Sequence, residues 1–67
     1  MKTLKEWALE MQATAAAKIQ RGLLKADMTA TLTARIDRMI AIADACDPAR
    51  KFDATMAQKY FLENMQI

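Results

Sequence analysis

The sequence has no histidine and only one residue each of cysteine, glycine and proline. Without histidine, the commonest general base and the commonest ligand of transition metals are both missing. One cysteine cannot form a disulfide within the chain, so we expect a fold that does not depend on oxidation. Valine is absent as well, which leaves isoleucine and threonine as the only β-branched residues that favour strands. These absences argue against most enzyme classes and against a β-sheet domain.

A long uninterrupted apolar run is also missing. Lys2, Lys5 and Glu6 interrupt the first positions, whereas a signal peptide needs about 7–15 consecutive apolar residues. No charge-free stretch approaches the ~20 residues that cross a bilayer as a helix. The sequence therefore predicts no signal peptide, no membrane contact and a cytoplasmic location.

The residues that are abundant favour helices. Alanine occurs 14 times in 67 residues, and leucine and methionine occur six times each; these are among the strongest helix formers. The length allows one domain, and a chain this short buries only about 60% of its unfolded surface. We predict a single all-α domain over residues 1–67, an antiparallel helical hairpin with a shorter third helix. The three helices are expected at about residues 4–21, 27–46 and 54–65.

Local signals define the first helix. Thr3 and Glu6 have the spacing of a capping box, in which the hydroxyl and the carboxylate each accept a backbone N–H. Gly22 lies where a left-handed residue would end the helix. A continuous helix through Gly22 is the alternative, since an interior glycine costs only about 1 kcal/mol. We favour the break.

The later boundaries depend on aspartate and proline. Asp27 is suited to the N-cap or first turn of the second helix, where its charge is favourable. Pro48 disfavours helical geometry in the residue before it, so the second helix should end there. Asp47 and Asp53 are both expected to cap helix starts. The conformation of Pro48–Phe52 stays open at this level.

The first and third helices have more apolar perimeter than one core can bury. At 100° per residue, the first helix has two apolar stripes, whereas the second has one conventional side. The core stripe of the first helix comprises Leu4, Trp7, Ala8, Met11, Ala15 and Ile19, and its second stripe comprises Leu9, Ala13, Ala16 and Leu23. The apolar side of the second helix comprises Met28, Leu32, Ile36, Met39, Ile40, Ala43 and Cys46. The third helix has Ala54, Ala57, Phe61 and Met65 on one flank and Met56, Tyr60 and Ile67 on the other.

This surplus predicts a non-catalytic protein–protein interaction module, such as an adaptor, an inhibitor or an assembly factor. We expect it to associate with itself, as a homodimer or small oligomer, or with another protein. Trp7 and Tyr60 are the candidate aromatic anchors, although Trp7 is equally suited to the core. The candidate interface residues are Trp7, Leu9, Met11, Ala13, Ala16, Leu23, Met56, Tyr60, Phe61 and Met65.

Nucleic-acid binding is the alternative function. A small helix-turn-helix-like regulator would use the cationic residues near the predicted hairpin turn. These are Lys18, Arg21, Lys25, Arg35 and Arg38. The net charge of +2 is a weak footprint for a polyanion, and Asp27 and Asp37 lie in the same segment. The sequence therefore favours protein binding.

Candidate chemistry is sparse. Cys46 is flanked by Asp44 and Asp47, which disfavour a thiolate, and no histidine could activate it. Glu6 and Glu10 are one helical turn apart, but a helical di-metal site also needs histidine ligands from other helices. We predict no catalytic residue, no metal and no cofactor.

Overall fold

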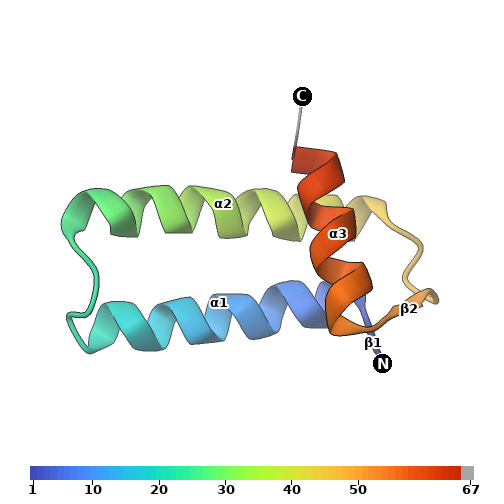
Figure 1. Cartoon of the computed structure of the whole chain (residues 1–67), viewed down its shortest axis with the longest axis horizontal. Coiled ribbons are helices and arrows are strands. Elements are labelled where there is room, and N and C mark those ends of the chain that lie inside the picture. The colour runs from blue at the N-terminus through green and yellow to red at the C-terminus, as the bar shows by residue number, and fades with distance from the viewer. Residues whose placement is uncertain (66–67) are drawn as a thin grey trace.

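The structure is a computed structural model that describes residues 1–65 of the chain, so Ile67 of the predicted apolar flank lies outside the described residues. It contains α1 (Leu4–Gln20), α2 (Ala26–Ala45) and α3 (Ala54–Met65), with two short strands, β1 (Lys2–Thr3) and β2 (Lys51–Phe52). Helices α1 and α2 form an antiparallel hairpin, and α3 lies across it near the N-terminal end of α1 (Figure 1). The prediction of an all-α domain with a hairpin and a shorter third helix is confirmed.

The capping box at the start of α1 is present as predicted. The backbone N–H of Glu6 donates to Thr3 Oγ1 at 3.2 Å, and the backbone N–H of Thr3 donates to Glu6 Oε1 at 3.1 Å. Two backbone donors that lack helical partners are thereby satisfied. The hydrogen bond from the Thr3 backbone, followed by that from the Thr3 hydroxyl, lowers the pKa of Glu6 below its ordinary value of 4.5.

This lowered pKa predicts a pH-dependent contribution to stability. Because Glu6 is a stronger acid in the folded chain, its contribution is complete above pH 4.5 and is lost as the pH falls through the folded pKa. We expect Glu6→Gln to destabilise the domain at pH 6 and to have a smaller effect at pH 2.5. Urea unfolding followed by circular dichroism at both pH values measures this difference. A constant difference between the two proteins at every pH contradicts the assignment.

Helix α1 ends at Gln20, and Gly22 follows directly after its C-cap residue Arg21, so the predicted break is confirmed. Gly22 has a φ of +69°, a left-handed conformation that glycine adopts without steric cost. Its N–H donates to the Ile19 carbonyl at 3.0 Å, and the Leu23 N–H donates to the Lys18 carbonyl at 3.1 Å. This pair of bonds is a Schellman motif, which satisfies the last carbonyls of the helix and turns the chain toward α2.

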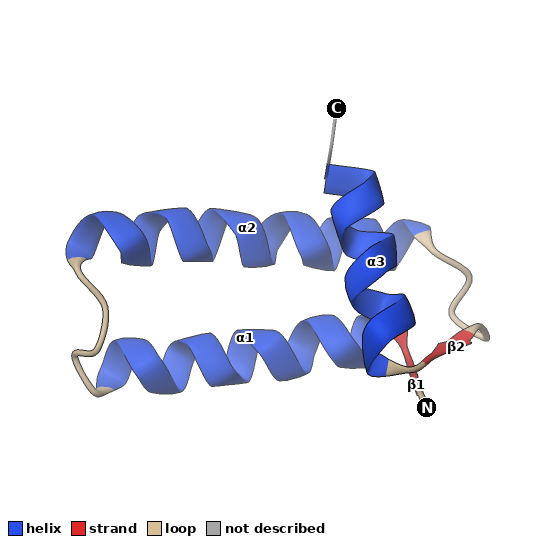
Figure 2. Cartoon of the chain, viewed as in Figure 1, coloured by secondary structure: helices blue, strands red, loops and turns tan. Residues whose placement is uncertain are grey.

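The segment between α2 and α3 is the largest departure from expectation. Asp47 caps no helix. Its carboxylate accepts the Ala49 N–H at 2.9 Å, and its carbonyl accepts the Arg50 N–H at 3.2 Å, which makes a turn around Pro48. The chain then pairs antiparallel with the N-terminus, with Lys2 opposite Phe52 (Figure 2). Asp53 caps α3 as expected, accepting the Met56 N–H at 2.7 Å.

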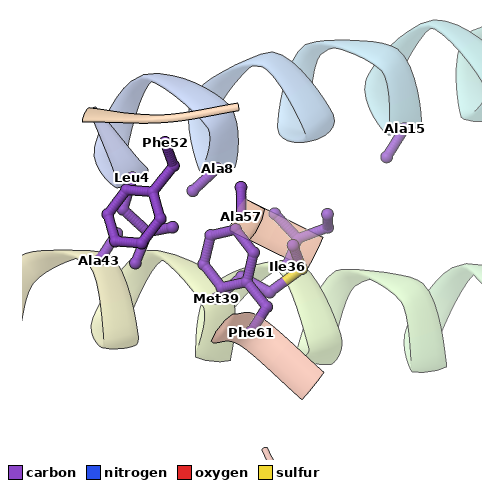
Figure 3. Close-up of a cluster of buried hydrophobic side chains, with 9 residues drawn as sticks. All are labelled: Leu4, Ala8, Ala15, Ile36, Met39, Ala43, Phe52, Ala57 and Phe61. Carbon is purple, nitrogen blue, oxygen red and sulfur yellow. The ribbon is translucent and has the colours of Figure 1, made fainter. Parts of the chain in front are cut away.

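The core lies at the end of the hairpin that α3 and β2 cover (Figure 3). Phe52 and Leu4 are its largest fully buried side chains. Phe52 packs edge-on against Tyr60, with ring centroids 5.4 Å apart. The buried set is Leu4, Ala8, Ala15, Ile36, Met39, Ala43, Phe52, Ala57 and Phe61.

Two residues of the predicted core stripes lie outside this core. Ile19 is 39% exposed and Met28 is 52% exposed. Both lie near the turn that joins α1 to α2, whereas α3 crosses the hairpin at its other end (Figure 1). The periodicity correctly identified the apolar sides of both helices, but the third helix is too short to cover their full length.

Candidate functional site

An open groove of about 770 Å³ lies among the three helices. One side of α1, one side of α2 and the edge of α3 line it. The α1 side extends from Trp7 to Lys18, which corresponds to about 16 Å at 1.5 Å per residue. This length matches about three turns of a docked helix.

The lining of the groove is mostly apolar. Met11 and Ala15 contribute from α1, and Leu32 and Ile36 contribute from α2. Leu62 forms part of the α3 wall and is 54% exposed. An apolar groove with a few polar groups at its edge is the usual form of a site that receives a helix or another apolar ligand.

Charged side chains lie along both long sides of this groove. Lys18 and Glu10 lie on α1, and Arg35 lies on α2. Glu10 forms an ion pair with Lys2, whose ammonium also lies 4.8 Å from the centroid of the Trp7 ring. Within residues 1–65, neither Lys18 nor Arg35 forms an ion pair. The groove therefore has two uncompensated positive charges on opposite sides.

Four of the predicted interface residues line the groove. These are Trp7, Met11, Phe61 and Met65. The sequence leaves open whether Trp7 is a core residue or an interface residue. In the structure Trp7 is half-buried against the core and also lines the groove. Its indole N–H donates to the Phe52 carbonyl at 2.8 Å, which fixes the ring and ties α1 to β2.

Phe61 is a core residue, with only 2% of its surface exposed. The sequence placed it on the same flank as Ala57, and the structure buries both. It lines the groove but has little exposed surface, so a docked partner would gain little from it directly. Its main role is to hold α3 against the hairpin.

The second stripe of α1 lies away from the groove. Leu9, Ala13 and Ala16 are exposed, and so is Leu23 in the connecting turn. Leu9 is two residues from Met11, a rotation of about 200° around the helix. The stripe therefore forms a separate apolar surface, with Leu9 45% exposed and Leu23 66% exposed.

The second flank of α3 faces away from the groove as well. Met56 is 45% exposed, whereas Tyr60 is half-buried against Phe52. Hydrogen bonding with the neighbouring Cys46 thiol raises the pKa of Tyr60 above its ordinary value of 10.0. Cys46 is half-buried and packs against the core. Met56, Tyr60 and Cys46 do not line the groove.

The sequence analysis missed Leu62, although a signal for it exists. Gln58, Leu62 and Met65 follow the i, i+4, i+7 spacing of one helix face, and all three line the groove. Of these three residues, only Met65 is predicted at an interface from the sequence. Leu32, Ile36 and Met39 were assigned to the core side of α2, and they also border the groove.

The cations predicted for nucleic-acid binding are divided. Lys18 and Arg35 line the groove, whereas Arg21, Lys25 and Arg38 lie outside its lining. The two cations that share a site have an apolar surface between them. Phosphate groups are bound through charged and hydrogen-bonding groups, so this arrangement suits an amphipathic ligand better than a nucleic-acid backbone.

The molecule exposes more surface than a compact chain of its mass. Its accessible surface is 4852 Å², compared with about 4,250 Å² expected for a monomer of this mass. The radius of gyration is 12.3 Å, compared with about 10.9 Å for a compact domain of this length. The open end of the hairpin accounts for this extension, since the core occupies the other end.

Residues 1–65 contain neither a metal-binding cluster nor a membrane-spanning helix. No group of three histidine, cysteine, aspartate or glutamate side chains lies close enough to hold a metal ion there. Within the same residues, every helix is too short or too polar to cross a membrane. Comparison with family models, with curated proteins and with solved structures finds no match to this chain.

Proposed function

We propose that this chain is a non-catalytic protein–protein interaction module that receives a helix of its partner in the groove between α1 and α2. The open apolar groove carries the proposal. Its floor and wall come from three helices, and it has the length of about three helical turns. Helix-in-groove docking uses such a surface, with apolar anchors at i, i+3, i+4 and i+7 on the incoming helix.

Burial of the groove supplies the driving force. Leu62 lines the groove and is more than half exposed, and full burial of such a side chain contributes about 1.5–3 kcal/mol. Trp7 adds a rigid aromatic surface, of the kind that dominates binding energy at interfaces. Met11 and Met65 supply flexible side chains that adapt to the shape of a partner.

A matched pair of variants in α3 tests this function. Leu62→Gln removes an apolar side chain from the groove wall, and we expect it to weaken partner binding by about tenfold or more. Met56→Gln is the control, since Met56 has a similar exposure, at 45%, and lies outside the groove. Tagged wild-type and variant proteins are compared by capture from the native host and quantitative mass spectrometry. Equal capture by the two variants contradicts docking in the groove.

Self-association is the second part of the proposal. The exposed stripe formed by Leu9, Ala13, Ala16 and Leu23 supports it, because the small residues allow close approach and the leucines provide buried area. We expect Leu9→Glu to reduce the mass of the particle in solution while most of the helicity is kept. Light scattering at micromolar concentration and circular dichroism measure both properties. A wild-type mass of 7.5 kDa at all concentrations contradicts self-association.

A further inference from the structure

The charged side chains around the groove indicate which kind of ligand it binds. Lys18 projects from α1 and Arg35 from α2, so the two long sides of the groove each have one cation. Within residues 1–65, both lack an ion-pair partner, whereas the only carboxylate of the lining, Glu10, is paired with Lys2. A ligand lying along the groove therefore meets a positive charge on either side of an apolar floor.

We infer that the occupant is an amphipathic helix of another protein whose apolar stripe has aspartate or glutamate on both flanks. This inference rests on the proposed function and adds the charge of the partner. The apolar stripe contacts Met11, Leu32 and Leu62, and the acidic flanks meet Lys18 and Arg35. Complementary charge of this kind sets orientation and association rate more than total affinity.

A second copy of this chain fits the groove less well. In a two-fold symmetric dimer, the same surface patch of both subunits forms the interface. Two grooves that face each other would therefore bring the Lys18 and Arg35 side chains of one copy toward those of the other. Like charges brought together at an interface are unfavourable, so charge complementarity favours an acidic partner.

The expected effect of the charges is moderate and depends on salt. Exposed ion pairs contribute little individually and are screened by salt, with a Debye length of about 8 Å at physiological ionic strength. We expect two such pairs to make an acidic helix bind about tenfold more tightly than a basic helix with the same apolar stripe. The preference should largely vanish at about 1 M salt, where the Debye length is about 3 Å.

Three synthetic peptides test the inference against the full chain. Each is a helix of about five turns with one identical leucine stripe, and the flanking positions are all glutamate, all glutamine or all lysine. Fluorescence titration follows binding through Trp7, the only tryptophan of the chain. We expect the glutamate peptide to bind most tightly, the glutamine peptide less tightly and the lysine peptide most weakly. We also expect the double variant Lys18→Gln with Arg35→Gln to bind all three peptides with the same affinity.

The outcomes separate the inference from the proposed function. If the three peptides bind equally and Leu62→Gln weakens all of them, the groove binds helices without regard to charge and the inference is wrong. If none of the peptides binds, the groove function is contradicted as well. If the protein alone is a dimer that Leu62→Gln dissociates, the occupant is a second copy. If a duplex DNA of 20 base pairs displaces the glutamate peptide, Lys18 and Arg35 bind nucleic acid, and the inference is wrong.

Discussion

Phe52→Ala is expected to remove a large part of the stability of the protein at 25 °C. Phe52 is 1% exposed, and removal of such a ring from a core costs about 3–5 kcal/mol. A chain of 67 residues has a total stability of only about 3–10 kcal/mol. We therefore expect the melting temperature to fall by at least about 12 °C. Thermal unfolding followed by circular dichroism measures it.

The fluorescence of Trp7 provides a second readout for this variant. The indole N–H donates to the Phe52 carbonyl, so displacement of β2 exposes the indole to water and shifts its emission to longer wavelength. Phe52→Leu is the control, because leucine keeps most of the apolar volume and should retain most of the stability. An unchanged melting temperature in Phe52→Ala would mean that β2 does not belong to the core.

Phe61→Glu is expected to unfold the protein. Phe61 is 2% exposed, and a carboxylate at this position must either be buried without a partner or be protonated at a cost in stability. Since Phe61 joins α3 to the Ile36 and Met39 side of α2 in the core, its replacement removes α3 and exposes the hairpin. We expect loss of most of the helical signal in circular dichroism at neutral pH.

The neighbouring position provides a matched control for this substitution. Leu62→Glu introduces the same side chain one residue further along, at a position that is 54% exposed. We expect this variant to retain its helicity, because the carboxylate remains in water. If the two variants are equally stable, Phe61 is not a core residue and the assignment of the two faces of α3 is wrong.

The helices and their ends are the features that the sequence predicted best. A cap acts between residues three or four positions apart, as in Thr3 with Glu6, and the left-handed conformation at Gly22 depends on that residue alone. Each of these signals therefore lies within a few residues of the helix end that it determines. The expected helix bounds at about residues 4–21, 27–46 and 54–65 therefore differ from the observed bounds by one residue or less.

Apart from the predicted helix cap at Asp47, the predictions that failed concern contacts between distant segments. Phe52 lies in a segment whose pattern indicated no element, and its burial depends on pairing with the N-terminus, 50 positions away at Lys2. Phe61 was assigned to an interface because the periodicity of α3 identifies apolar flanks without showing which flank meets the hairpin. Ile19 and Met28 have core spacing, but no described element covers them.

Local propensity, caps and periodicity are enough to predict a helical hairpin with a third helix, and helices with more apolar surface than their own core buries. These signals act within a few residues. The position of the surplus apolar surface cannot be predicted in this way, because it depends on the path of the segment between α2 and α3. This path buries Phe52 and sets α3 across one end of the hairpin, and the groove with its two cations lies open beside it.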